Sequence, residues 1–384
     1  MMPEIESDSY IPVNEPLLDG NEKRYLNECI DSGWISSEGP FVEKFEAQFA
    51  ARVSRKYAIS VTNGSAALEV AVSALGIGPG DEVILPSFTI ISCAAAVVRV
   101  GATPVLVDSN PNTWNMDVAQ VAAKITVRTR AIMVVHTYGL PVEMEAILTL
   151  AKQHNLAIIE DAAEMHGQCY EGKPCGSFGD ISVFSFYPNK HVTTGEGGMI
   201  VTDDIQLSDR CRSLRNLCFK LTPRFVHEEL GWNLRFTNLQ AAVGLAQLER
   251  LDEFVARKRR MGALYSAALE ELADIQLPLE KTDYALNIYW VFGIVVDAKL
   301  ASAEKIMDAL QKKRIGTRPF FWPMHEQPVF RKMGLFKNEQ YPVAENLARQ
   351  GFYIPSGLAL TEDRIRRCAQ AVIDIISEIR NPSP

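Results

Sequence analysis

The chain has 384 residues, of which 47% are hydrophobic and 22% are charged, and its formal net charge is −8, from 39 basic and 47 acidic side chains. This composition is ordinary for a soluble globular protein with a core large enough for two domains. The acidic balance argues against nucleic-acid binding. We expect a cytoplasmic protein that does not enter the membrane. Its first residues are acidic and polar, unlike a signal peptide, and its most apolar stretch, residues 83–107, is broken by two prolines, an arginine and a glycine.

The cysteines and histidines show no ligand-like spacing. The seven cysteines are odd in number and form no CxxC pair, which is typical of reduced thiols in a cytoplasmic protein. The six histidines show neither HxxxH nor HxH spacing. We therefore expect no metal site.

The first two thirds of the chain alternates between strand-like and helical patterns. An extended start leads into predicted helices at residues 22–30 and 39–53. From residue 57 onward, apolar runs alternate with helical patterns, and this predicts a largely parallel, doubly wound sheet. The predicted strands are residues 57–61, 82–85, 104–108, 131–137, 157–160 and 181–186, and the helices between them are 65–75, 91–100, 118–125 and 143–154. Residues 197–202 add a strand that could run antiparallel.

The last third of the chain has a different pattern. Long helices are predicted at residues 238–251 and 252–272, followed by a proline-containing linker. The elements after them are predicted as strands at 289–296 and 318–321 and helices at 302–313 and 362–379. Strands and helices that are grouped in this way, rather than alternating regularly, favour a smaller α+β unit. We therefore predict a large α/β domain over residues 1–255, including the N-terminal segment, and a small domain over residues 256–384.

One lysine, Lys190, lies between a strand-like run and a glycine-rich turn, in the stretch FSFYPNKHVTTGEGGM (residues 184–199). Pro188 ends the run, and three glycines after the lysine let backbone approach backbone or a ligand closely. A lysine held at a strand's end inside a fold is poorly hydrated, so its pKa falls. An imine-forming lysine needs that property, and an ordinary loop lysine is the alternative interpretation.

Four other features would form one ligand site with Lys190 if they meet at the carboxyl ends of the strands. Thr62–Ser65 joins a strand to a helix start, which makes either an anion site or a plain helix cap. The acidic run Glu160–Glu164 follows an apolar strand and could pair with a positive ring nitrogen or cap a helix. Ser185 could reach a phosphate on a lysine-bound ligand, or be an ordinary strand serine. Residues 231–238 are polar and aromatic and precede a strong helix.

A phosphate-binding turn, an aspartate and a lysine preceded by a serine are the parts that a pyridoxal 5′-phosphate enzyme requires. In such an enzyme the lysine forms the imine and later moves a proton. The aspartate keeps the pyridine nitrogen protonated, so that the ring accepts electrons. The turn holds the phosphate.

At this point the sequence resembles the DegT/DnrJ/StrS sugar aminotransferases, which have the aspartate aminotransferase fold (fold type I). The resemblance covers the chain from Tyr10 to the terminal helix. It rests on Asn63-Gly64-Ser65, GPGDEVILPSFT from Gly78, Glu160–Glu164, SFYPNK ending at Lys190, GEGGM from Gly195, and GWNLRFTNLQAAVGLAQLER from Gly231. The individual tripeptides are unspecific, but the set is highly specific.

The resemblance implies the following roles in this chain. Lys190 would hold the cofactor as an imine, and Asp161 would face its ring nitrogen. The cofactor phosphate would be bound by Asn63, Gly64, Ser65 and Ser185. Asn233 would reach the phosphate from the neighbouring subunit, so the active unit would be a homodimer with its active site at the subunit interface. Glu164 would lie near the ring hydroxyl and the substrate.

The family usually places Trp or Tyr after PSxT to stack on the cofactor ring, whereas this chain reads PSFTI over residues 86–90. Isoleucine can cover a ring by dispersion but cannot stack as an aromatic side chain does. Either Phe88 or Ile90 covers the ring, and its position favours Ile90.

Within the family, four stretches are most similar to the GDP-perosamine synthases: residues 34–37, 189–190, 193–198 and 318–325. Those enzymes move an amino group from glutamate to C4 of GDP-4-keto-6-deoxymannose, for O-antigen polysaccharide, and their cofactor alternates with pyridoxamine 5′-phosphate. Tyr187-Pro188 and residues 215–218 depart from that pattern, in loops that would line the sugar site. On this resemblance we expect substrate contacts from Trp34, Ser36, His191, Arg235, Arg318 and His325.

Three classes of function compete at this stage. The first is an aminotransferase on a GDP-linked, or alternatively a UDP- or dTDP-linked, keto sugar. The second is a 3-dehydratase on the same fold, but such relatives replace the lysine with histidine, whereas Lys190 is intact here. The third is a non-enzymatic sensor, which would be expected to lose Lys190 or Asp161.

Overall fold

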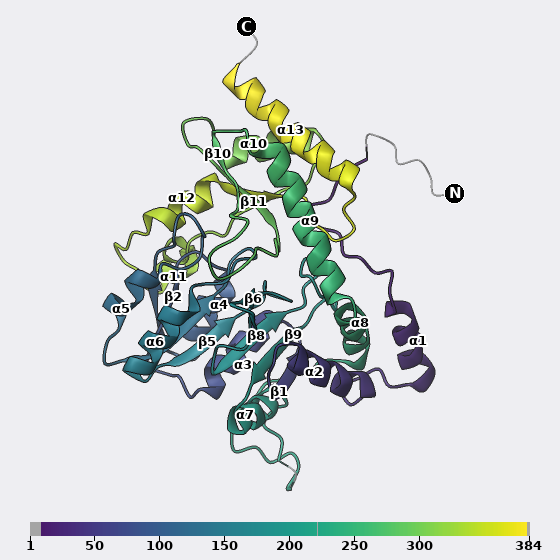
Figure 1. Ribbon diagram of the computed structural model, residues 1–384. Coiled ribbons are helices and arrows are strands. Elements are labelled where there is room, and N and C mark those ends of the chain that lie inside the picture. Colours follow the sequence, from purple (N-terminus) through teal and green to yellow (C-terminus); the bar gives the residue numbers. More distant parts are fainter. Residues whose placement is uncertain (1–8, 221, 382–384) are drawn as a thin grey trace.

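Figure 1 shows the computed structural model of the chain, which describes residues 9–220 and 222–381. Within these residues a seven-stranded sheet has the order β1-β9-β8-β5-β4-β2-β3. Only β9 runs antiparallel to its neighbours, as the sequence allowed. The strands are β1 (Tyr57–Val61), β2 (Glu82–Pro86), β3 (Thr103–Val107), β4 (Thr129–Val135), β5 (Ala157–Asp161), β8 (Ile181–Ser185) and β9 (Gly198–Thr202).

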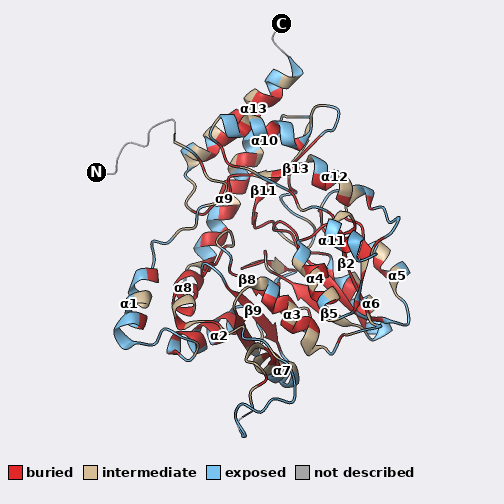
Figure 2. Cartoon of the chain, turned by 180° about the vertical axis from the view of Figure 1, so that it is seen from behind, coloured by how far each residue is buried: buried red, intermediate tan, exposed pale blue. Residues whose placement is uncertain are grey.

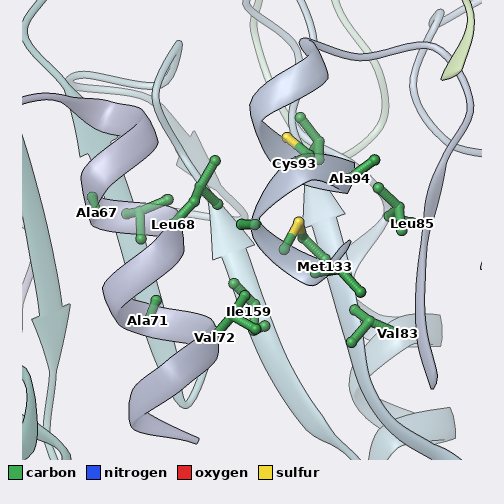
Figure 3. Packing of buried hydrophobic residues seen from close by; sticks show 14 of the residues in the cluster. Ala67, Leu68, Ala71, Val72, Val83, Leu85, Cys93, Ala94, Met133 and Ile159 are labelled. Atoms are coloured by element: carbon green, nitrogen blue, oxygen red, sulfur yellow. The ribbon is translucent and has the colours of Figure 1, made fainter. Parts of the chain in front are cut away.

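Helices cover both faces of this sheet. One face carries α3 (Gly64–Ala74), α4 (Ile91–Arg99) and α7 (Ile205–Arg215), and the other carries α2 (Pro40–Arg52), α6 (Met144–His154) and α8 (Asn238–Leu248). Strand β2 shows why: Val83 and Leu85 pack with α3 and α4 (Figure 3), whereas Ile84 packs with α6 on the opposite face. Successive side chains of the strand point to opposite faces, and those on both faces are apolar and buried, as in other doubly wound sheets.

The core beside α2 is rich in aromatic side chains, and Phe49 is central to it. Phe49 is 1% exposed, and its ring centroid lies 4.8 Å from that of Phe184 and 5.3 Å from that of Phe186. We expect Phe49→Ala to lower the free energy of unfolding by about 3–5 kcal/mol, because it leaves a cavity that close-packed neighbours cannot fill. Urea unfolding measures the change. Val127→Ala, at a residue 94% exposed, is the control, and an equal effect of the two substitutions would contradict the packing argument.

A smaller layer stacks above the large sheet in Figure 1. Its four strands are antiparallel, in the order β10-β11-β13-β12. Their bounds are β10 (Ile275–Gln276), β11 (Phe292–Val296), β12 (Arg318–Pro319) and β13 (Gly351–Ile354); the helices are α10 (Ala303–Lys312), α11 (Pro328–Lys332), α12 (Pro342–Gln350) and α13 (Glu362–Arg380). The long helix α9 (Leu251–Leu269) continues from α8 up to α13. The predicted domain boundary at residue 255 therefore falls inside one unbroken helix.

The N-terminal part of the chain contributes to both layers. Helix α1 (Glu22–Ser32) packs against α8 beside the large sheet. By contrast, Ile11 is fully buried in the core of the smaller layer and forms a bridge with Ile315. The first described residues therefore pack on the smaller layer, although they were predicted to belong to the large domain.

Other differences from the predicted elements occur in short or distorted segments. Residues 118–125 form a 3-10 turn, η1 (Val118–Gln120), followed by the single-turn helix α5 (Val121–Lys124), rather than one helix. The elements that were not predicted are α7, α11, α12, β10, β13 and the short elements β6 (Cys169–Tyr170), β7 (Lys173–Pro174) and η2 (Met324–Glu326).

Burial follows the two layers, as Figure 2 shows: the sheet strands and the inner faces of the helices are buried, and the outer helix faces are exposed. Among the described residues, no helix combines the length and the apolar content that crossing a lipid bilayer requires.

Candidate active site

A cavity of about 950 Å³ opens at the carboxyl ends of the parallel strands. Residues that end or follow β1, β2, β4, β5 and β8 line it, as expected for a ligand site in an open α/β sheet. Nine predicted site residues meet there: Asn63, Gly64, Ser65, Ile90, Asp161, Glu164, Ser185, Lys190 and Arg318.

The start of α3 forms one wall of the cavity. Asn63 caps the helix, because its side-chain oxygen accepts the Ala66 N–H at 2.8 Å. Gly64 lies so close to the end of β8 that a Cβ atom on it would be 2.8 Å from the Ser185 Cβ. Ser65, in the first turn of α3, also lines the cavity, and its hydroxyl lies 2.6 Å from that of Ser92. Helix N–H groups and two hydroxyls thus gather around a recess that a side chain at Gly64 would fill, and this donor set suits a phosphate group.

Asp161, the last residue of β5, presents a buried carboxylate to the cavity and is 3% exposed. Its Oδ1 accepts the Ala163 N–H at 3.0 Å, and its Oδ2 accepts the Cys93 thiol at 3.3 Å. Burial raises the pKa of Asp161, while the Ala163 N–H, the Cys93 thiol and the charge of Lys190 act in the opposite direction. A cationic N–H group placed against this carboxylate would relieve its poor hydration.

The amine of Lys190 lies between a carboxylate and an aromatic ring. Its Nζ is 3.7 Å from Glu164 Oε1 and 3.8 Å from the ring centroid of Trp290. Burial lowers the pKa of Lys190, and the charges of Glu164 and Asp161 oppose that effect. Burial likewise raises the pKa of Glu164 to about 7, against the opposing charge of Lys190. The amine is therefore easier to deprotonate than a surface lysine, as a nucleophile requires.

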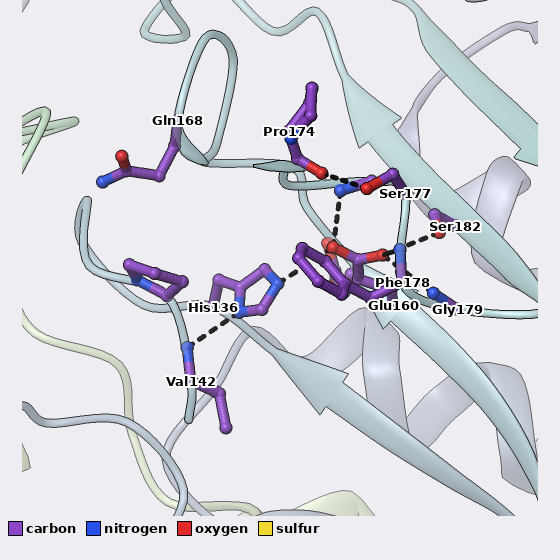
Figure 4. A network of polar contacts seen from close by, with 12 residues as sticks. His136, Val142, Glu160, Gln168, Pro174, Ser177, Phe178, Gly179 and Ser182 are labelled. Atoms are coloured by element: carbon purple, nitrogen blue, oxygen red, sulfur yellow. Dashed lines mark hydrogen bonds and ion pairs between the residues drawn. The ribbon is translucent and has the colours of Figure 1, made fainter. Parts of the chain in front are cut away.

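A second buried carboxylate, Glu160, precedes Asp161 in β5 and binds the loop of residues 176–179 (Figure 4). Glu160 is fully buried and accepts five hydrogen bonds, from His136 Nε2, the N–H groups of Gly176, Phe178 and Gly179, and the hydroxyl of Ser182. His136 Nδ1 accepts the Val142 N–H at 3.0 Å, so the ring donates to Glu160 from Nε2. Burial alone would raise the pKa of Glu160, but His136 and the backbone donors lower it to about 2.

We expect Glu160→Gln to destabilise the fold by roughly 3 kcal/mol at neutral pH, because an amide cannot accept all five donors and part of it would face N–H groups. The pKa of Glu160 is about 2 in the folded chain, below its ordinary value of 4.5. The carboxylate therefore stabilises the fold fully above pH 4.5, and this stabilisation is lost as the pH falls toward 2.

Urea unfolding of both proteins between neutral and acidic pH measures this effect. The difference in unfolding free energy should be largest at neutral pH and should shrink as the pH falls below 4.5. A difference that does not depend on pH would contradict the assignment of the stabilisation to the charged form.

Phe88 was one of the two candidates for covering the cofactor ring. It is fully buried, with its ring 5.9 Å from those of Tyr138 and Phe320, and it does not line the cavity. Ile90, which is 44% exposed, does line it. This position corrects the assignment of Phe88 to the cofactor site.

Two histidines that we expected to contact substrate are buried away from the cavity. His191 is 1% exposed, and its Nε2 donates to the Ile288 carbonyl at 3.2 Å. His325 is 2% exposed, and its two ring nitrogens lie 2.9 Å from Ser87 Oγ and 3.0 Å from Glu345 Oε1. These positions correct both expectations, because each imidazole is held inside the fold by its own hydrogen bonds.

Four other predicted residues lie outside this chain's own cavity. Trp34 and Ser36 are exposed in the turn after α1. Asn233 is exposed and pairs with Asn216, whose side chain accepts a hydrogen bond from Arg235 at 2.8 Å. Asn233 and Arg235 follow the loop that extends from α7 in Figure 1, and short bridges join them to Asn216 and Val61.

Sequence reasoning missed several residues at the site, among them Trp290, Tyr353, Thr137 and the Cys93 that donates to Asp161. Thr137 could have been found, since it is the last residue of a predicted strand. Trp290 and Tyr353 come from the smaller layer, and no local pattern signals which of its side chains reach the large sheet.

Comparison with known proteins identifies relatives along almost the whole chain. Residues 16–373 match the DegT/DnrJ/EryC1/StrS aminotransferase family. Proteins named GDP-perosamine synthase from Escherichia coli O157:H7 and Caulobacter vibrioides are each 43% identical, over 96% and 95% of this chain and 99% and 98% of their own. One from Vibrio cholerae is 38% identical over 94% of this chain and 98% of its own.

The solved structures agree with this result. The X-ray structure of the aminotransferase from Psychrobacter cryohalolentis has a TM-score of 0.90 and 30% identity to this chain, covering 97% of it and 100% of that protein. The fold and the donor set define a pyridoxal 5′-phosphate-dependent aminotransferase of fold type I. More specifically, the chain belongs to the DegT/DnrJ/EryC1/StrS aminotransferase family.

Proposed function

We propose that this enzyme moves an amino group from glutamate to C4 of GDP-4-keto-6-deoxymannose, giving GDP-perosamine for O-antigen and thus lipopolysaccharide synthesis in the cytoplasm. The observation that carries the proposal is the agreement of three relatives from different organisms. All three are named GDP-perosamine synthase and are 38–43% identical over nearly full length.

The residues of the cavity supply what the cofactor needs from the chain. Pyridoxal 5′-phosphate, when bound, provides an aldehyde that accepts amino groups and a ring that accepts electrons. In our proposal Lys190 would hold the aldehyde and, when its amine is free, would move the proton. Asp161 would keep a proton on the ring nitrogen, and Ile90, which lines the cavity, would cover the ring.

The phosphate group would be held by the N–H groups at the start of α3 together with two hydroxyls. These groups belong to Gly64, Ser65 and Ser185, while Asn63 fixes the helix start through its cap. Glu164 would lie beside the reacting groups, and Arg318, which lines the cavity, would bind the anionic substrate.

A second copy of the chain would complete the site, making the enzyme a homodimer. The loop after α7 exposes Phe225 (73%), Val226 (54%) and Leu230 (94%), which is unusual for apolar side chains unless a partner covers them. Asn233 lies just beyond this loop and lines no part of its own cavity. We propose that it reaches the phosphate in the partner, with Trp34, Ser36 and Arg235 near the shared substrate site.

The division into residues 1–255 and 256–384 stays a proposal about folding units. A buried cluster around Tyr265 and Phe292 that lies in the smaller layer supports it. Another cluster joins Leu85 of the large sheet to Phe320 of the smaller layer and ties the two units together. The continuity of α9 and the docking of Ile11 onto the smaller layer imply that these units do not move independently.

The experiment that tests the proposed substrate is a panel of GDP-, UDP- and dTDP-linked 4-keto-6-deoxy sugars, each incubated with the holoenzyme and glutamate. Product masses should show amination of the GDP sugar, and an NMR spectrum of the product should place the nitrogen at C4. Turnover of only the UDP or dTDP sugars would overturn the assignment of the nucleotide. Loss of a hydroxyl without gain of nitrogen would indicate a 3-dehydratase instead.

A UDP-linked substrate is the second candidate, and one comparison favours it. A protein from Acidithiobacillus ferrooxidans is named UDP-N-acetyl-3-dehydro-alpha-D-glucosamine 3-aminotransferase. It is 38% identical over 85% of this chain and 86% of its own length. The same panel separates the two, since that activity would place nitrogen at C3 of a UDP sugar.

A further inference from the structure

The amine of Lys190 lies about as close to the uncharged ring of Trp290 as to the carboxylate of Glu164. The ring centroid of Trp290 lies 3.8 Å from Nζ, at the distance of a cation–π contact, while Glu164 Oε1 lies 3.7 Å away. The lysine side chain is 10% exposed and Trp290 is 3% exposed, so little water competes with either contact. A desolvated ammonium over an indole face is the strongest form of this interaction.

Trp290 is fixed in this position from several directions. Its indole Nε1 donates to the Asn189 carbonyl at 2.8 Å, one residue before the lysine that it faces. Its own carbonyl accepts the buried Lys258 Nζ at 2.8 Å. Its ring also packs at 5.7 Å from that of Tyr138. A tryptophan held by hydrogen bonds at both ends of the residue cannot turn its face away from Nζ without breaking them.

One turn positions both groups that flank the lysine. The N–H of Tyr138 donates to Glu164 Oε2 at 2.7 Å. The next residue, Gly139, has φ +114°, and a Cβ there would be 3.0 Å from the Trp290 N and 2.7 Å from the Tyr289 N. Tyr289 itself has a positive φ of 48°, a conformation that non-glycine residues rarely adopt. Backbone strain directly before Trp290, in a closely packed turn, is typical of a functional position.

The other ionisable groups around the amine do not replace this contact. Asp161 and Glu164 are the carboxylates whose charge acts on Lys190. The charge of Lys190 also acts on three buried bases, His166, His191 and Lys258. Burial lowers the pKa of His166 to about 3, that of His191 well below its usual range, and that of Lys258 to about 7. Both imidazoles are therefore neutral at neutral pH and do not stabilise an ammonium.

We propose that the indole of Trp290 is the surface on which Lys190 holds its proton as an ammonium whenever its amine is free of the cofactor. Trp290 touches the reacting nitrogen and is in this sense a catalytic residue. It stabilises the charged lysine after the amine has taken a proton from carbon and before it returns that proton to another carbon. This inference rests on the proposed role of Lys190.

The test measures the protonation of Lys190 in the full-length chain loaded with pyridoxamine 5′-phosphate, in which the lysine amine is free. Competitive labelling with acetic anhydride over a range of pH, followed by peptide mass spectrometry, gives the pKa of Lys190. We expect Trp290→Leu to lower this pKa by about one unit, roughly a tenfold shift from ammonium to amine. Trp290→Phe keeps a smaller aromatic face and should lower it by less.

Trp114→Leu is the matched control. Trp114 is 2% exposed and packs on Tyr138 and Phe320, and it makes no cation–π contact with Lys190. Trp114→Leu should lower the thermal stability about as much as Trp290→Leu does, and it should leave the pKa of Lys190 unchanged. The proposal is overturned if the pKa in Trp290→Leu equals or exceeds the wild-type value, or if Trp114→Leu lowers it equally.

The measurement needs no sugar substrate, so it stands apart from the nucleotide assignment. Borohydride reduction of the holoenzyme and peptide mapping show separately which lysine carries the cofactor. A cofactor found on another lysine would refute the proposed role of Lys190, whereas an unchanged pKa would refute only the role of Trp290.

Discussion

Lys190→Ala is expected to reduce amino transfer by more than about 10³-fold, the largest effect of any single substitution in this chain. The substitution removes both the amine that binds the cofactor and the base that moves the proton, and a positioned base alone contributes about 10²–10⁴-fold. Nζ lies inside the cavity, and the buried bases nearby, Lys258, His166 and His191, do not line it. Lys190 is the only lysine among the described residues that lines the cavity, so no other side chain there can form the imine.

Single-turnover assays with the pyridoxamine form measure the rate, and the visible absorption of the lysine-bound cofactor should vanish in the same variant. Lys152→Ala, at an exposed position on α6, is the control and should behave as wild type. Turnover retained within tenfold by Lys190→Ala would contradict the assignment.

Asp161→Asn is expected to have the second largest effect, roughly a hundredfold to a thousandfold loss of activity together with weaker cofactor binding. The amide keeps the size of the side chain but carries no charge to hold a proton on a ring nitrogen. Removing one partner of a buried ion pair typically costs about 3–5 kcal/mol, which is the basis of this magnitude. Cofactor affinity, measured by titrating the cofactor-free chain, should fall in parallel with the rate.

Asp108→Asn is the matched control for this experiment. Asp108 is 5% exposed and accepts the N–H groups of Val343 and Ala344, outside the cavity. It should lower thermal stability while leaving cofactor affinity unchanged. If the two asparagine variants bound cofactor equally well, Asp161 could not be the ring-nitrogen partner.

The large sheet was predictable because most of its strands are short apolar runs between helical patterns, as burial on both faces requires. The antiparallel β9 could be foreseen as a possibility, because no helix separates it from β8 and a parallel neighbour needs a crossover connection, usually a helix. By contrast, β13 (Gly351–Ile354) is only four residues long and gains its stability from β11, almost sixty residues earlier. Local propensity carries no information about such a pairing.

The site residues were likewise predictable where local sequence places them and not where distant parts of the chain do. Residues at strand ends, such as Asp161 and Ser185, were found because sheet geometry places them at one edge. His191 was misjudged because it is adjacent in sequence to Lys190, yet the loop turns its side chain in the opposite direction, into the core. Trp290 was missed because its place depends on Gly139, 151 positions earlier, which alone leaves room for its backbone.

Residues 11–13 bind to residues 314–356, so during synthesis on the ribosome they cannot reach their folded position until those residues have been made. Ile11 exchanges backbone hydrogen bonds with Arg314 and Gly316, and Val13 accepts one from Ser356. These partners emerge roughly 300 residues later, which takes about 15–60 s at about 5–20 residues per second. Until then the N-terminal segment has no sheet to join. A nascent chain stalled before residue 314 should therefore leave its N-terminus open to protease, whereas the released protein should protect it.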